Sequence, residues 1–354
     1  MTTDEHTKVI VSVDVEDWYH GPTMSARWDS RNSLDKLLAA NPGIERACSY
    51  IDIVLELLER RRVKATFFWV AEYARRFPAL FARVAAAGHE IACHGLTHFS
   101  KLDYRTKQAV FSPREFKARA LTARKILEDM SGRPVRGYRA PNAYVSGAML
   151  DALEETGFTY DSSVSVSSIY NKTDSSLAGV TSAPYYPAPG ELRASNQSRS
   201  LVEFPWPYYS AAGVKIQSAG GPYLRFFGSG LIIRGLRQSL RRGHAVFYFH
   251  PIDLCNESIP MRFSPRRPFL WLFKGDLVKR RVERVLDTFP NRTACFGQIM
   301  EEQKNELGLR AMPFYRTATT PDGLSELGQG CSCGSIEPLC FVHRRQGRLR
   351  RKII

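Results

Sequence analysis

The sequence predicts an α/β fold in which helices cover a parallel sheet. Short apolar segments alternate along the chain with amphipathic segments of helical spacing. Polar residues gather directly after several of the apolar segments. The chain has 354 residues, of which 44% are hydrophobic and 24% charged, as is ordinary for a folded protein of catalytic size. Because active sites of α/β barrels form at the carboxyl ends of strands, we expect one site assembled from several strand ends.

The expected elements follow from apolar periodicity and from residues that start and stop helices. Pro113 after Ser112 predicts a helix start, and Gly88, Gly132 and Gly157 predict helix ends. Strands are expected at residues 9–13, 65–70, 90–93, 135–139, 158–161, 201–206, 245–250 and 292–296. Helices are expected at residues 44–62, 78–87, 113–130, 146–156, 224–242 and 276–288.

The same pattern predicts a single catalytic domain over residues 1–305. Residues from about 165 to 200 are rich in Ser, Pro, Ala and Tyr, and are expected to form an insertion or a long loop. Periodicity fades after about residue 306, so residues 306–354 are expected to form a basic, flexible tail.

The net charge is +15, and basic residues cluster at residues 234–242, 262–284 and 344–354. A solvated basic surface is the simplest interpretation, and peripheral contact of these patches with a membrane surface is the alternative; no specific nucleic acid is expected. The N-terminus shows no basic region followed by an apolar stretch, and no apolar run approaches the ~18 residues that span a bilayer. With only seven cysteines, these features predict a cytoplasmic protein with reduced thiols, with attachment at the inner face of the membrane as the alternative.

An acidic motif, Asp14-Val15-Glu16-Asp17-Trp18, follows the first expected strand. Its three carboxylates repel one another unless a cation or a shared proton relieves them. The motif therefore predicts a metal site or an acid–base site, and a solvated acidic turn is the alternative.

Three further segments carry residues suited to the same chemistry. His94 and His98 are four residues apart, a spacing that lets both imidazoles reach one divalent metal if the segment turns helically. Arg139 lies at the end of an expected strand and can clamp a carboxylate bidentately. His250 follows another strand and is a candidate general acid. Taken singly, each has a plainer interpretation: a surface pair, an arginine in a turn and a core histidine.

Taken together in this order, the segments resemble the polysaccharide deacetylase family, also called carbohydrate esterase family four or the NodB-homology domain. The stretch from Ala65 to His98 is the most specific part, and the resemblance covers about residues 8–300. It implies a distorted (β/α)7-type barrel and one divalent metal ion, most often zinc. It also implies that Asp14 is the catalytic base, that Arg139 orients it and that His250 protonates the leaving amine.

The resemblance further implies that His94, His98 and an acidic residue bind the metal. The family's usual acidic motif has two adjacent Asp residues, but here Val15 follows Asp14. Either Glu16 or Asp17 could therefore supply the carboxylate, and we favour Asp17 because an Asp is the usual ligand. The motif version Asp-Val-Glu-Asp-Trp resembles a subgroup that includes proteins of bacterial exopolysaccharide gene clusters.

Two other departures concern the partner of His250 and the substrate groove. The motif that supports the late histidine is not evident; segments 160–163 and 203–206, with Asp161 and Glu203, are the candidates. Asn142 stands where the family commonly has Tyr. The expected substrate-binding residues are Trp18, Pro141, Asn142 and Tyr144.

We therefore expect a metal-dependent hydrolase that removes N-acetyl groups from an amino-sugar-containing glycan or glycan precursor. Its partner would be an N-acetylated sugar or oligosaccharide. One alternative is hydrolysis of a non-sugar linear or cyclic amide, in an allantoinase-like reaction. The other is a catalytically inactive carbohydrate-binding homologue.

Overall fold

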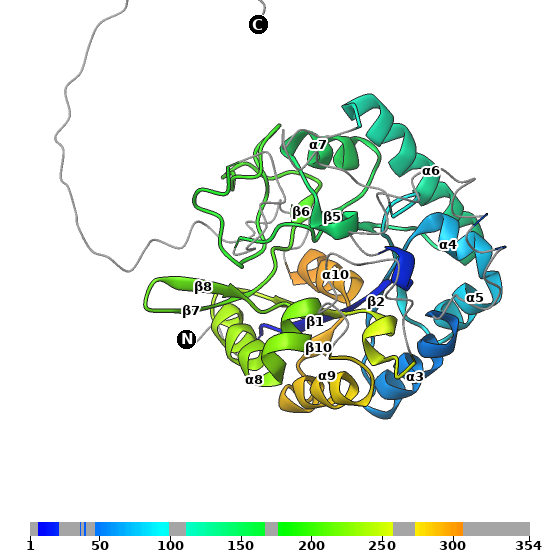
Figure 1. Cartoon of the computed structure of the whole chain (residues 1–354). Helices are drawn as coiled ribbons and strands as arrows, with labels where there is room; N and C mark the ends of the chain where they lie inside the picture. The colour runs from blue at the N-terminus through cyan, green and yellow to red at the C-terminus, as the bar shows by residue number, and fades with distance from the viewer. Residues whose placement is uncertain are drawn as a thin grey trace, which may run out of the picture. The chain divides into compact units, whose positions relative to one another are not determined.

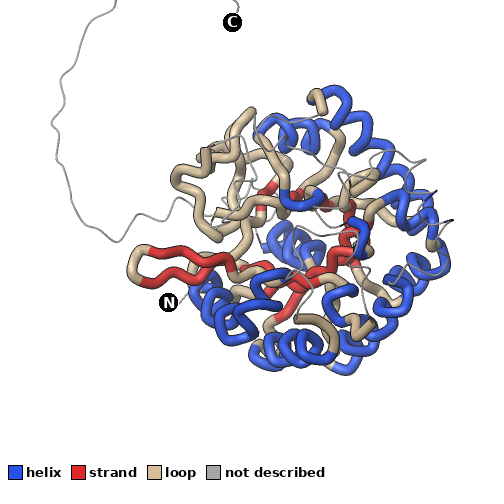
Figure 2. The backbone as a smooth tube through the Cα atoms, viewed as in Figure 1, coloured by secondary structure: helices blue, strands red, loops and turns tan. Residues whose placement is uncertain are grey.

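A curled sheet of parallel strands forms the centre of the structure, with helices around it (Figure 1, Figure 2). A computed structural model of the chain describes residues 6–20, 36, 39, 47–98, 111–166, 176–257 and 273–306. All of them belong to one compact unit, Met1–Ala318. The tail expected at residues 306–354 lies outside the described residues except for its first, so it stays a prediction.

Strand β1 organises the sheet because it pairs with three other strands, all parallel to it. It contacts β9 on one side and β2 on the other, while the short β10 pairs with its first residues. No pairing between β6 and β9 is present among the described residues, so the barrel is open between these two strands. The strands in sheet order are β9 (Ala245–Phe249), β1 (Val9–Val15), β2 (Thr66–Trp69), β3 (Glu90–Cys93), β4 (Gly137–Tyr138), β5 (Tyr160–Asp161) and β6 (Val202–Glu203), with β10 (Thr293–Ala294) beside the start of β1.

The helices cover the outer face of this sheet, as Figure 1 shows. They are α3 (Ala47–Arg60), α4 (Ala71–Arg76), α5 (Pro78–Ala86), α6 (Pro113–Ser131), α7 (Gly147–Glu155), α8 (Gly221–Leu240) and α9 (Asp276–Thr288), whereas α10 (Phe296–Glu306) lies elsewhere. The expected limits of α6 are confirmed: the Glu115 N–H donates to the Ser112 hydroxyl, and Gly132 ends the helix with φ of 65°. Short 3-10 turns η1 (Trp18–His20), η2 (Pro141–Ala143) and η3 (Pro251–Leu254) follow the carboxyl ends of β1, β4 and β9.

Three elements were not expected from the sequence. The helix α4 is only six residues long, and the hairpin of β7 (Tyr208–Ala211) and β8 (Val214–Gln217) has no clear alternation of apolar residues. Helix α10 lies in the middle of the ring of helices in Figure 1. It binds the first residues of two strands, because the Phe296 N–H donates to Thr66 and the Gly297 N–H donates to Glu90. It therefore closes the amino-terminal end of the barrel.

Alternation along β1 decides which side chains enter the barrel. All seven residues of β1 are buried. Val9, Val11, Val13 and Val15 pack in the layer beneath the helices. Ile10 instead packs in the interior with the rings of other strands, so the residues in phase with it point to the same side. Asp14 and Glu16 share that phase.

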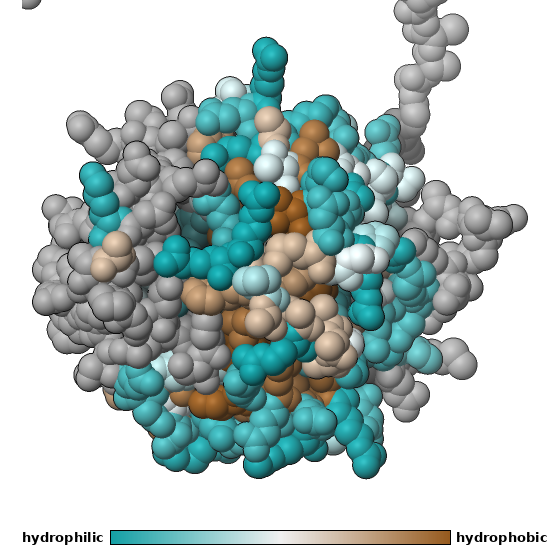
Figure 3. Space-filling view, turned by 90° about the vertical axis from the view of Figure 1, so that its right-hand side faces the viewer, coloured by the Kyte–Doolittle hydropathy of each residue, from teal (hydrophilic) through white to brown (hydrophobic). Residues whose placement is uncertain are grey.

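The outer surface follows the usual division of helices into apolar and polar faces. Figure 3 shows the side of the molecule that carries α4, α5 and α6 in Figure 1. Hydrophilic side chains there surround an apolar region in the middle of the face. Around this region, the helices present their hydrophilic side chains to the outside.

No helix among the described residues is both long enough and apolar enough to cross a bilayer. The basic residues expected at 234–242 lie on α8 and the residue pair after it, with Arg234, Arg237 and Arg241 exposed. Contact of these basic clusters with a membrane surface stays a prediction.

Phe296 provides a test of the interior packing. It is fully buried, and its ring lies 4.8 Å from the Tyr160 ring and 5.1 Å from the Phe204 ring. We expect Phe296→Ala to lower the free energy of unfolding by about 3–5 kcal/mol, because it leaves a cavity among rigid rings. Urea unfolding measures the change. Leu121→Ala on α6, where the side chain is 46% exposed, should change it by only about 0.5 kcal/mol, and similar losses in both variants would contradict the packing.

Candidate active site

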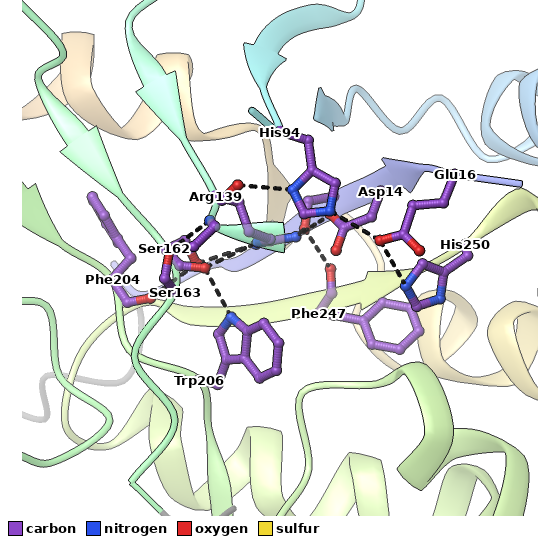
Figure 4. Close-up of polar contacts among 12 residues, drawn as sticks. Asp14, Glu16, His94, Arg139, Ser162, Ser163, Phe204, Trp206, Phe247 and His250 are labelled. Atoms are coloured by element: carbon purple, nitrogen blue, oxygen red, sulfur yellow. Dashed lines mark hydrogen bonds and ion pairs between the residues drawn. The ribbon is translucent and has the colours of Figure 1, made fainter. Parts of the chain in front are cut away.

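One carboxylate oxygen of Glu16 lies among three histidines at the carboxyl end of the sheet. Glu16 Oε1 is 2.9 Å from His94 Nε2 and 2.8 Å from His98 Nε2. His250 Nε2 is 3.8 Å from the same oxygen. Figure 4 shows His94 and His250 on either side of the Glu16 carboxylate, with Asp14 beside it. The structure thus brings together four residues from three distant segments of the sequence.

The segment from His94 to His98 is a bend and not a helix, so its two imidazoles meet for another reason than the expected helical turn. Gly95 adopts φ of +87°, and a Cβ there would lie 2.9 Å from the Thr97 carbonyl. The N–H groups of Ala71 and Glu72 at the start of α4 donate to the carbonyls of Gly95 and Leu96. These contacts fold the segment back until the His94 and His98 rings lie 5.1 Å apart.

A divalent cation fits this donor set. His94 Nδ1 donates to the Arg139 carbonyl at 2.8 Å, which leaves the lone pair of His94 Nε2 facing Glu16. Two acceptors 2.9 Å apart repel each other unless a cation or a proton lies between them. Ligand atoms of Glu16, His94 and His98 all lie within 4.8 Å of one another. Two imidazoles and one carboxylate are a set that zinc accepts, with a position left for water.

The charge state of Glu16 agrees with this arrangement. Burial opposes its ionisation, but the charges of His98 and His250 and the contacts with His94 outweigh burial and hold the pKa of Glu16 well below its usual range. A carboxylate that stays ionised at all moderate pH values is a suitable metal ligand.

Asp17 lies outside this cluster, contrary to our preference for it as the carboxylate ligand. Its carboxylate accepts hydrogen bonds from the Trp18 N–H at 2.8 Å and from the Tyr73 hydroxyl at 3.0 Å, toward α4. The reason is that β1 extends to Val15, so Glu16 keeps the interior phase and the next residue points away. The arrangement favours Glu16 over Asp17.

Arg139 holds Asp14 through a buried ion pair. Its Nη1 lies 2.6 Å from Asp14 Oδ1 and 2.9 Å from the Ser12 hydroxyl. Its Nε and Nη2 donate to the carbonyl and the hydroxyl of Ser162, so the expected bidentate clamp on one carboxylate is not formed. The guanidinium also lies 4.1 Å from the centre of the Phe68 ring. Arg139 therefore fixes the direction of one Asp14 oxygen.

The partner of His250 is Asp253, which the sequence did not indicate. His250 Nδ1 and the His250 N–H both lie 3.0 Å from Asp253 Oδ2, and Arg225 Nε of α8 lies 3.3 Å from Asp253 Oδ1. The candidates Asp161 and Glu203 instead bind backbone N–H groups of residues 163 and 164. The available signal was the spacing His250-Pro251-Ile252-Asp253, because a residue three positions on faces back within a 3-10 turn.

Asp253 also changes the protonation of His250. Burial lowers the affinity of the imidazole for a proton, but the charges of Asp253 and Glu16 outweigh burial and raise the pKa of His250 to about 9. The imidazole thus carries a proton at neutral pH.

The four expected substrate-binding residues differ in exposure. Trp18 and Tyr144 are 2% and 6% exposed, and Pro141 is also buried. Asn142 is partly exposed and adopts φ of 57° in the turn after β4. Of this set, Asn142 is the most exposed.

Two family models match the chain. Residues 48–160 match the model described as polysaccharide deacetylase, and residues 167–298 match one described as a domain of unknown function (DUF3473). The first match includes His94, His98 and Arg139, and the second includes His250. The expected resemblance to the polysaccharide deacetylase family is confirmed, while the expected subgroup stays a prediction.

Two proteins that are similar to this chain are named as deacetylases. A peptidoglycan-N-acetylglucosamine deacetylase of Bacillus cereus is 27% identical over 137 residues, which are 39% of this chain and 60% of that protein. A chitooligosaccharide deacetylase of Sinorhizobium fredii is 49% identical over 45 residues, which are 13% of this chain and 21% of that protein. The chain therefore matches no more than about 60% of the length of these relatives.

The crystal structure of a "putative polysaccharide deacetylase" from Mycobacterium smegmatis aligns with a TM-score of 0.50 and 22% identity, over 90% of this chain and 96% of that one. The expected distorted (β/α)7-type barrel is confirmed by this likeness and by the parallel, curled sheet.

The choice between Glu16 and Asp17 leads to a direct test of metal binding. We expect Glu16→Ala to weaken zinc binding by about 100-fold or more, because it removes the carboxylate that faces both histidines. Asp17→Asn should bind zinc as the wild type does, since its carboxylate contacts Tyr73. Calorimetric titration with zinc, together with metal analysis of the purified proteins, measures both. Loss of zinc in Asp17→Asn with retention in Glu16→Ala would reverse the assignment.

Proposed function

We propose that this chain, a relative of the polysaccharide deacetylases, is a metal-dependent hydrolase that removes N-acetyl groups from an amino-sugar-containing glycan or glycan precursor. One observation carries the proposal. Ligand atoms of Asp14 and His250 lie within 4.8 Å of each other and of Glu16, which itself lies against His94 and His98. A candidate base, a candidate acid and a metal-binding set therefore surround one small volume.

Glu16, His94 and His98 would hold the metal, which we propose to be zinc. When bound, such an ion polarises an amide carbonyl and lowers the pKa of water. The contact of His94 with the Arg139 carbonyl keeps its Nε2 lone pair directed at that position.

Asp14 is placed to take a proton from water. Arg139 holds Asp14 Oδ1, and Asp14 Oδ2 accepts no hydrogen bond from the described residues. A carboxylate with one fixed oxygen and one open oxygen is oriented for a single proton transfer. Burial beside a guanidinium prevents it from rotating away.

His250 is placed to give a proton to the leaving amine. Its Nδ1 is bound to Asp253, so its Nε2 points toward Glu16 and the reacting volume. An amine is a poor leaving group unless it is protonated, so amide hydrolysis needs an acid as well as a base. The raised pKa of His250 keeps that proton available at neutral pH.

Residues of this chain also suggest how the acetamide would be held. Asn142 is partly exposed in the turn that follows Arg139, and its backbone N–H donates to no acceptor among the described residues. An N–H group at this position could stabilise the developing oxyanion. The turn is fixed from behind, because the Ala140 N–H donates to the Ser163 hydroxyl at 2.8 Å.

The substitution Asp14→Asn tests the reaction. It keeps the shape of the side chain but cannot accept a proton, so we expect deacetylation of N-acetylated chitooligosaccharides to fall by about 10²–10⁴-fold with zinc retained. Mass spectrometry of the zinc-loaded enzyme's products measures the rate. Asp129→Asn, on the exposed face of α6, should be fully active. Near-normal activity of Asp14→Asn would exclude the base role.

The same assay separates the proposal from its alternatives. If small linear or cyclic amides are hydrolysed and chitooligosaccharides are not, the protein is an amidase of another class. If the zinc-loaded wild type binds the oligosaccharides without converting them, it is an inactive binding homologue.

The pair of His250 and Asp253 predicts a change in pH dependence. Asp253→Asn removes the charge that raises the pKa of His250, so the imidazole loses its proton at a lower pH. The alkaline limb of the kcat/KM profile should therefore move to lower pH, by about one unit or more. Asp276→Asn, exposed at the start of α9, should leave the profile in place. An unmoved alkaline limb in Asp253→Asn would show that another group supplies the proton.

A further inference from the structure

Two fully buried carboxyl groups, those of Asp161 and Glu203, have no part in the reaction proposed above. They end the neighbouring parallel strands β5 and β6, and they are directly paired in the register of the sheet. Each is 0% exposed. Buried acidic side chains without a metal or a matching cation are rare, so this pair requires a physical explanation.

Both carboxyl groups converge on the turn that follows β5. The Ser163 N–H lies 3.0 Å from Asp161 Oδ2 and 3.2 Å from Glu203 Oε1, so one donor lies between the two groups. The Ser163 hydroxyl donates to Asp161 Oδ1 at 2.9 Å, and the Val164 N–H donates to Glu203 Oε1 at 2.9 Å. Two negative charges this close in a buried place repel strongly, and the pair is stable only if one group is neutral.

The same turn binds Arg139. The Ser162 carbonyl accepts from Arg139 Nε at 3.0 Å, and the Ser162 hydroxyl accepts from Arg139 Nη2 at 3.1 Å. The Ser163 hydroxyl accepts from the Ala140 N–H, which follows Arg139 in the chain. The orientation of the guanidinium that holds Asp14 therefore depends on the position of residues 162 and 163.

We propose that Asp161 and Glu203 share one proton and act together as positioning residues, holding the turn at residues 162–164 against Arg139. Glu203 carries the proton and Asp161 the negative charge. The pair thus influences the direction of Asp14 indirectly, through the turn and then through Arg139. The catalytic part of this proposal rests on the proposed deacetylase reaction, and its electrostatic part does not.

The surroundings agree with this division of the proton. Burial raises the pKa of both groups, and proximity to Asp161 raises that of Glu203 further. Contacts with Glu203 and Ser163 and the charge of Arg139 partly offset burial at Asp161. The other titratable groups that face the pair are Tyr138 and Tyr185, and burial raises the pKa of both, so they stay neutral.

Glu203→Gln tests the shared proton, because glutamine keeps the shape and is always neutral. Above the ordinary Glu pKa, Glu203 is ionised in the unfolded chain and must bind a proton on folding. The wild-type protein therefore becomes less stable as the pH rises above that value. Glu203→Gln has no such group, so its stability does not fall for this reason. We expect its advantage in Tm over the wild type to grow between about pH 5 and pH 8.

Glu154→Gln is the matched control, with the opposite sign. Contacts with Arg199 and Ser200 overcome burial and lower the pKa of Glu154, so its contribution to stability is lost as pH falls. The deficit in Tm of Glu154→Gln should therefore be largest at neutral pH and shrink in acid. A difference between Glu203→Gln and the wild type that is independent of pH would overturn the shared proton.

Activity tests the positioning role. Asp161→Ala leaves the Ser163 hydroxyl without its acceptor and the Ser163 N–H with only the longer contact to Glu203, so we expect kcat to fall by roughly tenfold or more with KM nearly unchanged. Glu203→Gln should keep kcat within about threefold, because the amide can still donate to Asp161. Equal loss in both variants would overturn the role of the proton, and unchanged kcat in Asp161→Ala would overturn the positioning role. If the wild type proves not to be a deacetylase, the measurements of Tm still decide whether the proton is shared.

Discussion

The ion pair between Arg139 and Asp14 lies fully inside the barrel, where desolvation of two charges is expensive. Such a pair is maintained only if the remaining donors are also satisfied. The structure does this with the Ser12 hydroxyl and with the carbonyl and hydroxyl of Ser162. The faces of aromatic rings around the guanidinium, the nearest being Phe68 at 4.1 Å, supply further favourable charge contact. Loss of either partner would leave an uncompensated buried charge, at a cost of about 3–5 kcal/mol.

Arg139 connects the base to the metal-binding set through two separate groups. Its side chain directs Asp14, and its backbone carbonyl accepts from His94 Nδ1 and so fixes which nitrogen of that imidazole faces Glu16. A displacement of the strand end that carries Arg139 would disturb both at once. This explains why β5 and β6, which bear no reacting group, nevertheless end in groups that hold the turn at residues 162–164 in place.

Much of this arrangement was predictable, because the strands end where apolar runs stop and because parallel strands bring their carboxyl ends together. The convergence of His94, His98 and His250 follows from that rule. The carboxylate that lies among these histidines could not be predicted in the same way. The choice between Glu16 and Asp17 depends on whether β1 stops at residue 13 or continues to Val15. The partner of His250 was also missed, because we looked for a distant acidic residue, and the 3-10 turn supplies one three residues away. Helix α10 was missed because the apolar pattern after residue 296 is weak, and its position is set by contacts with β2 and β3.

The three carboxylates of the acidic motif would repel one another, and each has a different partner in the folded protein. Asp14 is paired with the guanidinium of Arg139, and Asp17 accepts from the Tyr73 hydroxyl and the Trp18 N–H. Within the part of the chain that the structure describes, Glu16 meets no guanidinium and no ammonium group, only imidazoles. The tautomer of His94 turns a lone pair toward this carboxylate, and the protonated His250 lies farther away, with its Nε2 at 3.8 Å. The repulsion that the sequence shows as three acidic residues within four positions is therefore replaced in the folded protein by one close contact, between the Glu16 carboxylate and the lone pair of His94, and a divalent cation at that position would relieve it.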